Sequence, residues 1–319
     1  MPIRLNDYQF GGSFISTYNI YLALVAQLDK LARHNRQGSF QTRRRYYEAM
    51  QRFCRYLAEA FRLQKLSNIN GKHLVAYTVF MQEHGKSAST VKTDLAAIRF
   101  FHDKMENAKY RLPGNDELGV ALERRRFGGV DRTWSAFEFN RMIGKAVEAN
   151  RDDIACALYL GRYAGLRIHE VMRLDTAAAE RALREDAITV KGKGGKIRTV
   201  PIEEERVRTA LRMMLDRTER GHTPLVPDGV LTDRAINGVQ LFILKHRDDV
   251  ADEDREANLT FHGLRHTYAA VKYHVLTENG MGVLDAHFAV SRLLGHERAD
   301  VTDIYLASVK KKEKEARND

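Results

Sequence analysis

The sequence predicts a protein of two domains, of which the first is α-helical and the second is mainly α-helical (α+β) with a small antiparallel β-sheet. The 319 residues exceed what a single hydrophobic core usually covers. Helical spacing of apolar residues runs through residues 1–130 without a strand-like segment, whereas strand-like alternation occurs within residues 187–202. We therefore expect a helical domain at 1–130 and a second domain at 131–319.

Composition narrows the class of protein. The 44% hydrophobic and 29% charged residues are typical of a globular protein with sizeable cores. No apolar run reaches the roughly 18 residues of a membrane span, and the start of the chain, MPIR, does not resemble a signal peptide. We therefore expect a cytoplasmic protein without membrane contact. Cys54 and Cys156 stand in apolar, helical contexts and are predicted to be small buried residues.

The net charge of +10 is concentrated in the first domain. Residues 1–130 contain 21 Lys and Arg against 11 Asp and Glu, and the rest of the chain contains 31 of each sign. A basic domain beside a neutral one indicates a polyanionic partner, most often DNA or RNA. A solvated basic surface without any ligand is the alternative.

Four helices are expected in the first domain, because apolar residues recur there with helical spacing. Asparagine and serine residues stand where two of these helices would be capped. The expected helix starts are Phe14, Thr42, Asn68 or Asn70, and Ser87 or Ser89. A break at residues 113–116 and the basic sequence RRRFGG at 124–129 predict a flexible strap between the domains.

Contacts to DNA are expected at cations and hydroxyl groups near the starts of these helices, because both suit phosphate oxygens. For each position, a solvated surface residue is an alternative that is at least as common. The candidates are Arg43, Arg44, Lys86, Ser87, Thr90, Lys92 and Arg99.

The second domain is expected to begin with a helix that Ser135 caps, since Glu138 completes a capping-box pattern. The apolar run 154–163 predicts a buried helix, which a glycine ends. Arg167 and Glu170 then stand three positions apart at the start of the next helix, so the carboxylate can support the guanidinium. An ordinary surface ion pair is the alternative.

A β-hairpin is predicted by two strand-like segments, 187–191 and 196–202, on either side of the sequence GKGG. Its glycine-rich tip would present Lys193. The segment is not a Walker phosphate loop, because the GxxxxGK[ST] pattern is absent from it and its glycines join two strands. Further along, the acidic residues 246–257 are expected to form an exposed loop.

Two pairs of polar residues follow the hairpin. His262 and Arg265 stand one helical turn apart and can converge on one ligand. His296 and Tyr305 are separated by nine positions near the end of the chain. Any one of these residues alone would be a surface, capping or packing residue, and a Tyr so placed usually packs through its ring.

Together these groups occur in the order found in the tyrosine site-specific recombinases, also called the phage integrase family, which the chain closely resembles. The resemblance rests on the segments AGLRIHEVMRL, VKGKGGKIRTVPI, HGLRHTYA and LLGHERADVTDIY. It extends to residues 1–130, which look like the family's SAM-like DNA core-binding domain with a basic linker at its end. The 34 positions from His262 to His296 are a departure, since this interval is longer than in the family, with the extra length within 278–287.

The resemblance implies a metal- and ATP-independent reaction that cuts and rejoins DNA strands through a 3′-phosphotyrosine. Tyr305 would attack the phosphodiester while Arg167 and Arg265 clamp its oxygens. Lys193 would protonate the leaving 5′-oxygen, and His262 would share the tyrosine proton. The implied catalytic set is Arg167, Lys193, His262, Arg265, His296, Tyr305 and Glu170, with no metal and no cofactor.

The resemblance also implies how the protein works as a whole. It would be a recombinase or integrase of a mobile element, acting as a homo-tetramer on a double-stranded DNA recombination site. The two domains would form a C-shaped clamp around the duplex, with accessory DNA-bending or directionality proteins as further partners. The alternatives are a type IB topoisomerase or telomere-resolvase-like enzyme, and a catalytically silent DNA-binding regulator of the same fold. RNA binding rests on charge alone.

Overall fold

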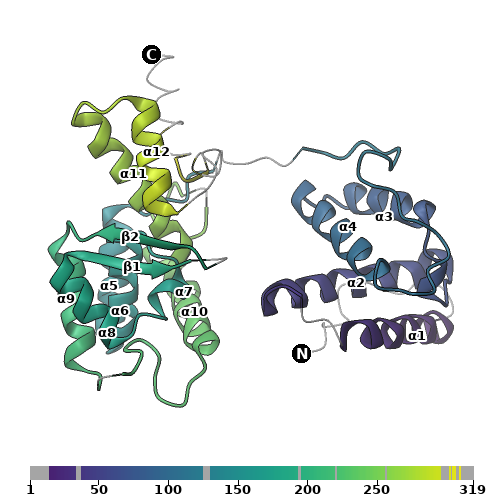
Figure 1. The fold of residues 1–319 in the computed structure, drawn as a ribbon, viewed down its shortest axis with the longest axis horizontal. Coiled ribbons are helices and arrows are strands. Elements are labelled where there is room, and N and C mark those ends of the chain that lie inside the picture. Colours follow the sequence, from purple (N-terminus) through teal and green to yellow (C-terminus); the bar gives the residue numbers. More distant parts are fainter. Residues whose placement is uncertain are drawn as a thin grey trace. The chain divides into compact units, whose positions relative to one another are not determined.

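The computed structural model describes residues 14–33, 37–124, 130–192, 195–219, 221–255, 257–295, 302, 304–306 and 309. The chain forms two compact units, Met1–Arg126 and Phe127–Asp319, and each has its own hydrophobic core (Figure 1). The predicted fold class is confirmed: over the described residues the first unit is helical, and the second is mainly helical with one two-stranded antiparallel sheet. No helix in the described ranges is long and apolar enough to cross a membrane.

The described part of the first unit contains the four expected helices. Asn70 is the N-cap of the third, and the Oγ of Ser87 accepts a hydrogen bond from the N–H of Thr90 at the start of the fourth. Helix α2 packs against α1 and α4, and its apolar face carries the buried Phe53 and Leu57. The helices are α1 (Phe14–Arg33), α2 (Phe40–Phe61), α3 (Gly71–Glu83) and α4 (Ala88–His102).

The predicted capping box opens the second unit. The N–H of Ser135 donates to Glu138 Oε2 at 2.9 Å, and the N–H of Glu138 donates to Ser135 Oγ at 3.0 Å. Helix α6 forms the centre of the unit, because it packs against α5, α7, α9 and α11. The helices described here are α5 (Ala136–Glu148), α6 (Asp152–Tyr163), α7 (Ile168–Val171), α8 (Thr176–Glu185), α9 (Glu205–Asp216), α10 (Thr232–Val250), α11 (Phe261–Glu278) and α12 (Val283–Leu294).

The sheet is the predicted hairpin, formed by β1 (Ala187–Lys191) and β2 (Ile197–Pro201). Strand β1 packs on α8, and β2 packs on α12 (Figure 1). In the register, Val190 is the partner of Arg198. Alternate residues of both strands face the core, as period-two geometry requires.

Both cysteines are buried, as predicted. Burial raises the pKa of the Cys54 thiol to about 12 and that of the Cys156 thiol to about 11. Neither thiol is therefore a reactive thiolate at neutral pH.

The prediction of an exposed loop at 246–257 is wrong in two respects. Helix α10 continues to Val250, because Val250 and Ile243 lie two turns apart and are both buried. Within the loop that follows, Arg255 is held by the buried Glu138, with Nε–Oε1 at 2.5 Å and Nη2–Oε2 at 2.7 Å. The acidic composition concealed an arginine that anchors the segment to α5.

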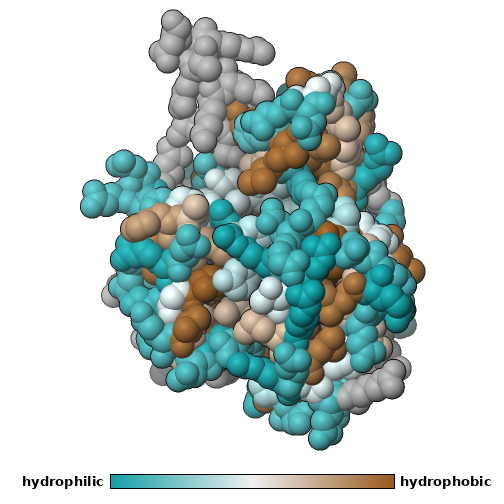
Figure 2. Space-filling model, turned by 90° about the vertical axis from the view of Figure 1, so that its left-hand side faces the viewer, coloured by the Kyte–Doolittle hydropathy of each residue, from teal (hydrophilic) through white to brown (hydrophobic). Residues whose placement is uncertain are grey.

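Residues 278–287, where the extra length is expected, span the end of α11, the turn after it and the start of α12. Val283, Leu284 and Phe288 of α12 are 64%, 74% and 51% exposed, so this helix carries an apolar outer face. The face of the molecule seen in Figure 2 is mostly hydrophilic, with smaller hydrophobic patches.

Candidate active site

The site begins where α6 ends. Gly165 has a left-handed φ of +59°, and Arg167 then becomes the N-cap of the single-turn helix α7. The main-chain N–H of Arg167 donates to Glu170 Oε2 at 2.7 Å, and its Nη1 donates to Glu170 Oε1 at 3.0 Å. The pair is not an ordinary surface ion pair, since the Glu170 side chain is fully buried and that of Arg167 is 24% exposed.

A second arginine, which sequence reasoning missed, completes this cluster. Arg198 of β2 donates to Glu170 through Nη1 to Oε1 at 2.5 Å and through Nη2 to Oε2 at 2.8 Å. A signal was available: Arg198 alternates with Val200 and Ile202, both buried, on the inward face of the hairpin.

The cluster keeps Glu170 ionised. Burial alone would raise the pKa of its carboxyl. The hydrogen bonds from Arg198, the main-chain N–H of Arg167 and the charges of both arginines outweigh burial and lower the pKa to about 2. The carboxylate therefore balances part of the positive charge of the two guanidinium groups.

Helix α11 contributes the second predicted pair. Thr260 caps it by accepting a hydrogen bond from the N–H of Gly263 at 3.2 Å. Arg265 is 1% exposed, and it donates from Nη1 to the carbonyl of Gly165 and from Nη2 to the carbonyl of Leu294. Its Nε has no hydrogen-bond partner among the described residues. Arg265 thus brings the entry to α7 and the end of α12 to one place.

Tyr305 lies against this pair within its own chain. Its ring centroid is 5.3 Å from that of His262 and 5.6 Å from Arg265 Cζ. His266, one turn after His262, stacks on the Tyr305 ring with centroids 4.4 Å apart and planes 29° apart. His266 was also missed, although it stands in the same HGLRH segment. The three rings and the guanidinium form one contiguous cluster.

Both histidines are neutral at neutral pH. Partial loss of water and the charges of Arg265, Arg167 and Arg132 lower the pKa of His262 to about 4, and part of this residue stays exposed to solvent. His266 is buried, and burial, the neighbouring His262 and the charges of Arg132 and Arg265 lower its pKa to about 3. Burial also lowers the pKa of Arg265 to about 10, which leaves that guanidinium charged at neutral pH.

Two predicted catalytic residues, Lys193 and His296, lie outside the described residues. The residue that precedes each of them is described. Gly192 precedes Lys193 at the end of β1, next to Glu170. Gly295 precedes His296 and ends α12 with a φ of +65°. Both neighbours therefore lie at the edge of the arginine cluster.

The candidate DNA contacts all belong to the first unit and stay predictions. Arg99 holds the loop after α4, with Nε donating to the Pro113 carbonyl and Nη1 to Asn115 Oδ1, both at 2.8 Å. Ser87 and Thr90 hydrogen-bond each other at the start of α4. The remaining candidates, Arg43, Arg44, Lys86 and Lys92, lie on or next to α2 and α4, and Arg44 pairs with Glu48 at 2.8 Å.

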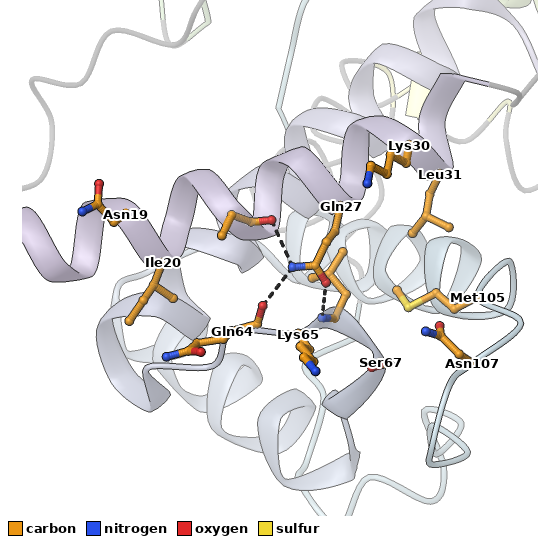
Figure 3. A pocket seen from close by; sticks show the side chains of 12 residues that line it. Asn19, Ile20, Gln27, Lys30, Leu31, Gln64, Lys65, Ser67, Met105 and Asn107 are labelled. Atoms are coloured by element: carbon orange, nitrogen blue, oxygen red, sulfur yellow. Dashed lines mark hydrogen bonds between the residues drawn. The ribbon is translucent and has the colours of Figure 1, made fainter.

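A hollow in the first unit is lined by residues other than those of this cluster. It has a volume of about 680 Å³ between α1 and the segment after α2 (Figure 3). Gln27 crosses it and binds the carbonyls of Ala23 and Gln64 and the N–H of Leu66. Its described lining contains no acid–base pair. A smaller hollow of about 370 Å³ beside the hairpin is lined in part by Glu170, Lys191 and Gly192.

Among the described residues, no group of three or more His, Cys, Asp or Glu side chains is arranged to hold a metal ion. The positive charge of the site comes from Arg167, Arg198 and Arg265. Two of these share one carboxylate, and the third is held by backbone carbonyls. Such a set of guanidinium groups suits an anionic ligand with several oxygens, above all a phosphate.

A two-unit protein with such an arginine, histidine and tyrosine cluster has the features of an enzyme that acts on phosphodiesters. Comparison with known proteins gives the family. Residues 135–312 match the phage integrase family, and residues 22–106 match the N-terminal domain of phage integrases. The chain belongs to the phage integrase family of tyrosine site-specific recombinases, and it is a recombinase enzyme.

Relatives and solved structures agree with this assignment. The chain is 27% identical over 278 residues to tyrosine recombinase XerC of Vibrio parahaemolyticus, covering 84% of this chain and 82% of the relative. It is 27% identical over 276 residues to XerC of Pseudomonas syringae pv. tomato, covering 86% and 87%. A lambda integrase tetramer bound to a Holliday junction shares the fold, with a TM-score of 0.62, 16% identity, and coverage of 88% and 76%. So does XerH bound to a palindromic difH substrate, with a TM-score of 0.59, 17% identity, and coverage of 96% and 89%.

Proposed function

We propose that the protein is a site-specific recombinase that cuts and rejoins DNA strands through a covalent 3′-phosphotyrosine, without metal or ATP. The observation that carries the proposal is the contact of Tyr305 with His262 and Arg265 in one chain. A tyrosine used only for packing needs no buried guanidinium beside it, because burying a charge is costly. A phosphate bound there would repay that cost.

In the proposed cleavage reaction, each of these groups has one role. The phenolic oxygen of Tyr305 forms a bond to phosphorus while the bond from phosphorus to the 5′-oxygen breaks. The neutral imidazole of His262 takes the phenolic proton, and Lys193 gives a proton to the leaving 5′-oxygen. Because the phosphotyrosine conserves the phosphodiester's energy, the reverse attack by a 5′-hydroxyl reseals the strand without ATP.

The arginines stabilise the transition state. Negative charge grows on the non-bridging oxygens as the tyrosine attacks, and fixed donors in a dry site stabilise it strongly. Arg167 offers the guanidinium edge that Glu170 does not use, and Arg265 offers the Nε that has no partner in the described part of the chain. His296 is proposed to hydrogen-bond the same phosphate. These cations supply the charge that a metal would otherwise provide.

The solved relatives support the choice of substrate. Lambda integrase was seen as a tetramer on a Holliday junction, and XerH was seen on its difH substrate. We accordingly propose that this chain binds a double-stranded recombination site, works as a homo-tetramer and serves a mobile element. The first domain would grip DNA through its basic surface and form a clamp with the second, in the cytoplasm and with accessory proteins.

Covalent trapping tests this proposal. The binding site is first selected from random-sequence duplexes with the full chain. A nicked duplex carrying that site should then yield a protein–DNA adduct with the wild type and none with Tyr305→Phe. Tyr110→Phe is the matched control, since Tyr110 is a half-exposed tyrosine of the first unit. An adduct that persists in Tyr305→Phe would refute the nucleophile.

The same material separates the alternatives. Relaxation of supercoiled plasmid that lacks the selected site would favour a type IB topoisomerase. Sequence-specific binding without any adduct, even on the nicked duplex, would favour a silent regulator.

A further inference from the structure

Arg198 is a nearly buried arginine whose side chain is held by two segments distant from its own strand. It lies on β2, and 8% of its side chain is exposed. Its two terminal nitrogens fork onto the Glu170 carboxylate at 2.5 and 2.8 Å. Its Nε donates to the carbonyl of Leu293 at 3.0 Å. One side chain therefore joins the hairpin, helix α7 and the last turn of α12.

The clamp residue Arg167 depends on the same carboxylate. Among the described residues, Glu170 receives four hydrogen bonds, two from Arg167 and two from Arg198. Because its side chain is fully buried, water cannot readily replace a lost donor. Removing the Arg198 fork would let the carboxylate turn, and Arg167 would move with it.

The hairpin meets this carboxylate from its other strand as well. A Cβ built on Gly192 would lie 3.6 Å from Glu170 Oε1 and 3.9 Å from Arg167 Nη1. The N–H of Gly192 donates to the carbonyl of Lys196 at 2.6 Å and closes the base of the tip. Lys193 follows Gly192 directly. The two strands at the base of the tip thus contact the Arg167–Glu170 pair through Gly192 on one strand and Arg198 on the other.

The third contact fixes the exit from α12. Arg198 holds the carbonyl of Leu293, and Arg265 holds that of Leu294. Gly295 follows in a left-handed conformation, and a Cβ there would lie 2.8 Å from Arg198 Cδ. His296 is the next residue. Two arginines therefore hold the consecutive carbonyls of Leu293 and Leu294, and Gly295 alone separates these from His296.

Stability alone is a poor explanation for such a pair. Buried ion pairs contribute little net free energy, because the desolvation of both charges offsets their attraction. A buried ion pair of this kind has a fixed, bidentate geometry, which an apolar pair of equal volume would lack. That geometry is the property that an active site needs.

We propose that Arg198 is a positioning residue for strand cleavage, which keeps Arg167, the Lys193 hairpin and the exit from α12 in mutual register. The proposal rests on the proposed function. Arg198 acts through Glu170 and through backbone, without contact to the reacting atoms.

Arg198→Lys in the full chain is the test, because lysine keeps the charge and loses the fork. On the nicked duplex carrying the selected site, the single-turnover rate of adduct formation should fall about 10- to 100-fold, the range expected for a misplaced catalytic group. Affinity for the duplex should change less than about threefold, because the Arg198 side chain is 8% exposed and offers little surface to the DNA. The control is Arg208→Lys, since Arg208 holds Asp186 and the Ile202 carbonyl at the other end of the hairpin.

A modified leaving group shows whether the hairpin is involved. A 5′-bridging phosphorothiolate leaves without protonation and so makes the general acid dispensable. The deficit of Arg198→Lys should shrink on this duplex. An equal deficit on the oxygen and sulfur duplexes would overturn the part of the proposal that concerns the hairpin.

The fraction of chains that form the adduct and the rate constant of adduct formation together distinguish a folding defect from a defect in cleavage. If Arg198→Lys reduces only the fraction of chains that react, at an unchanged rate constant, the residue is merely structural and the proposal fails. If the wild type forms no adduct, the proposed function fails first. If the wild type reacts and Arg198→Lys reacts equally fast, the positioning proposal alone is wrong.

Discussion

Glu170 is the residue on which most of the described site converges, and its ionisation makes the second unit sensitive to acid. Its pKa is about 2 in the folded chain, against an ordinary value of 4.5. A depressed carboxyl pKa stabilises the fold above pH 4.5, and this stabilisation is lost as the pH falls through 2. The second unit should therefore lose stability in acid through this residue.

The matched variant for this prediction is Glu170→Gln. Between about pH 5 and pH 2, the free energy of unfolding of the wild type should fall by about 3 kcal/mol more than that of the variant. Denaturation followed by the fluorescence of Trp134 measures it, because Trp134 is the only tryptophan and is buried in the second unit. Parallel pH curves for the two proteins would contradict the ionised, doubly paired carboxylate.

His266 is expected to act through its ring. It stacks on Tyr305, and its pKa of about 3 keeps it uncharged during the reaction. Because stacked rings contribute about 0.5–1.5 kcal/mol, His266→Ala should slow adduct formation by up to about tenfold. His266→Phe keeps a ring and should react within about threefold of the wild type.

Single-turnover adduct formation measures both variants, with His274→Ala as the control on the exposed side of the same helix. A His266→Phe variant as slow as His266→Ala would show that the imidazole nitrogens matter and the stacking does not.

The first turn of α11 must lie close to the segment that precedes α5. A Cβ on Gly263 would lie 2.5 Å from the carbonyl of Arg132 and 2.7 Å from Trp134 Nε1. The same contact is held by Trp134 Nε1 donating to the Thr260 carbonyl at 3.0 Å. Gly263→Ala should therefore force backbone apart and lower the free energy of unfolding by roughly 1–3 kcal/mol.

Gly144→Ala is the control for this prediction. Gly144 lies inside α5, and a Cβ added there would meet no atom of the described residues within 4 Å, so alanine should stabilise that helix by up to about 1 kcal/mol. Urea denaturation followed by Trp134 fluorescence gives both values. Equal effects at the two glycines would mean that the close approach at Gly263 is absent.

The helices and the hairpin could largely be predicted from the sequence, because their signals are local. Caps such as Ser87 and Ser135 and the two-residue period of the hairpin stand within a few positions of what they determine. Arg198 and Arg255 could not be found this way. Their partner carboxylates lie 28 and 117 positions away, and only folding brings them together.

The candidate site shows the same division. The pair of Arg167 and Glu170 was predicted because both stand on one helical turn. The stacking of His266 on Tyr305 was not predicted, because it joins α11 to a residue far along the chain. The resemblance to the family indicated the reactive groups and their order along the chain. Local spacing does not show which residues from distant segments contact these groups in the folded protein.

At the scale of the whole molecule, the two units have separate cores and different charge. Residues 1–130 carry the whole net charge of +10, and the described apolar residues form one cluster in each unit. We therefore expect binding and cleavage to be separable. Binding should depend on the basic first unit through the release of counterions, and cleavage of bound DNA should depend on the second.

Replacing Arg43, Arg44 and Lys92 together by Gln tests this division. Each lost phosphate contact should reduce the slope of log affinity against log salt by about 0.9, so three contacts should flatten it by up to about 3. The rate of adduct formation on saturated DNA should stay within about threefold of the wild type, because these residues lie in the other unit. The control replaces three exposed lysines of the first unit, Lys30, Lys65 and Lys72. If both triple variants flatten the slope equally, net charge and not a defined DNA-binding face governs affinity.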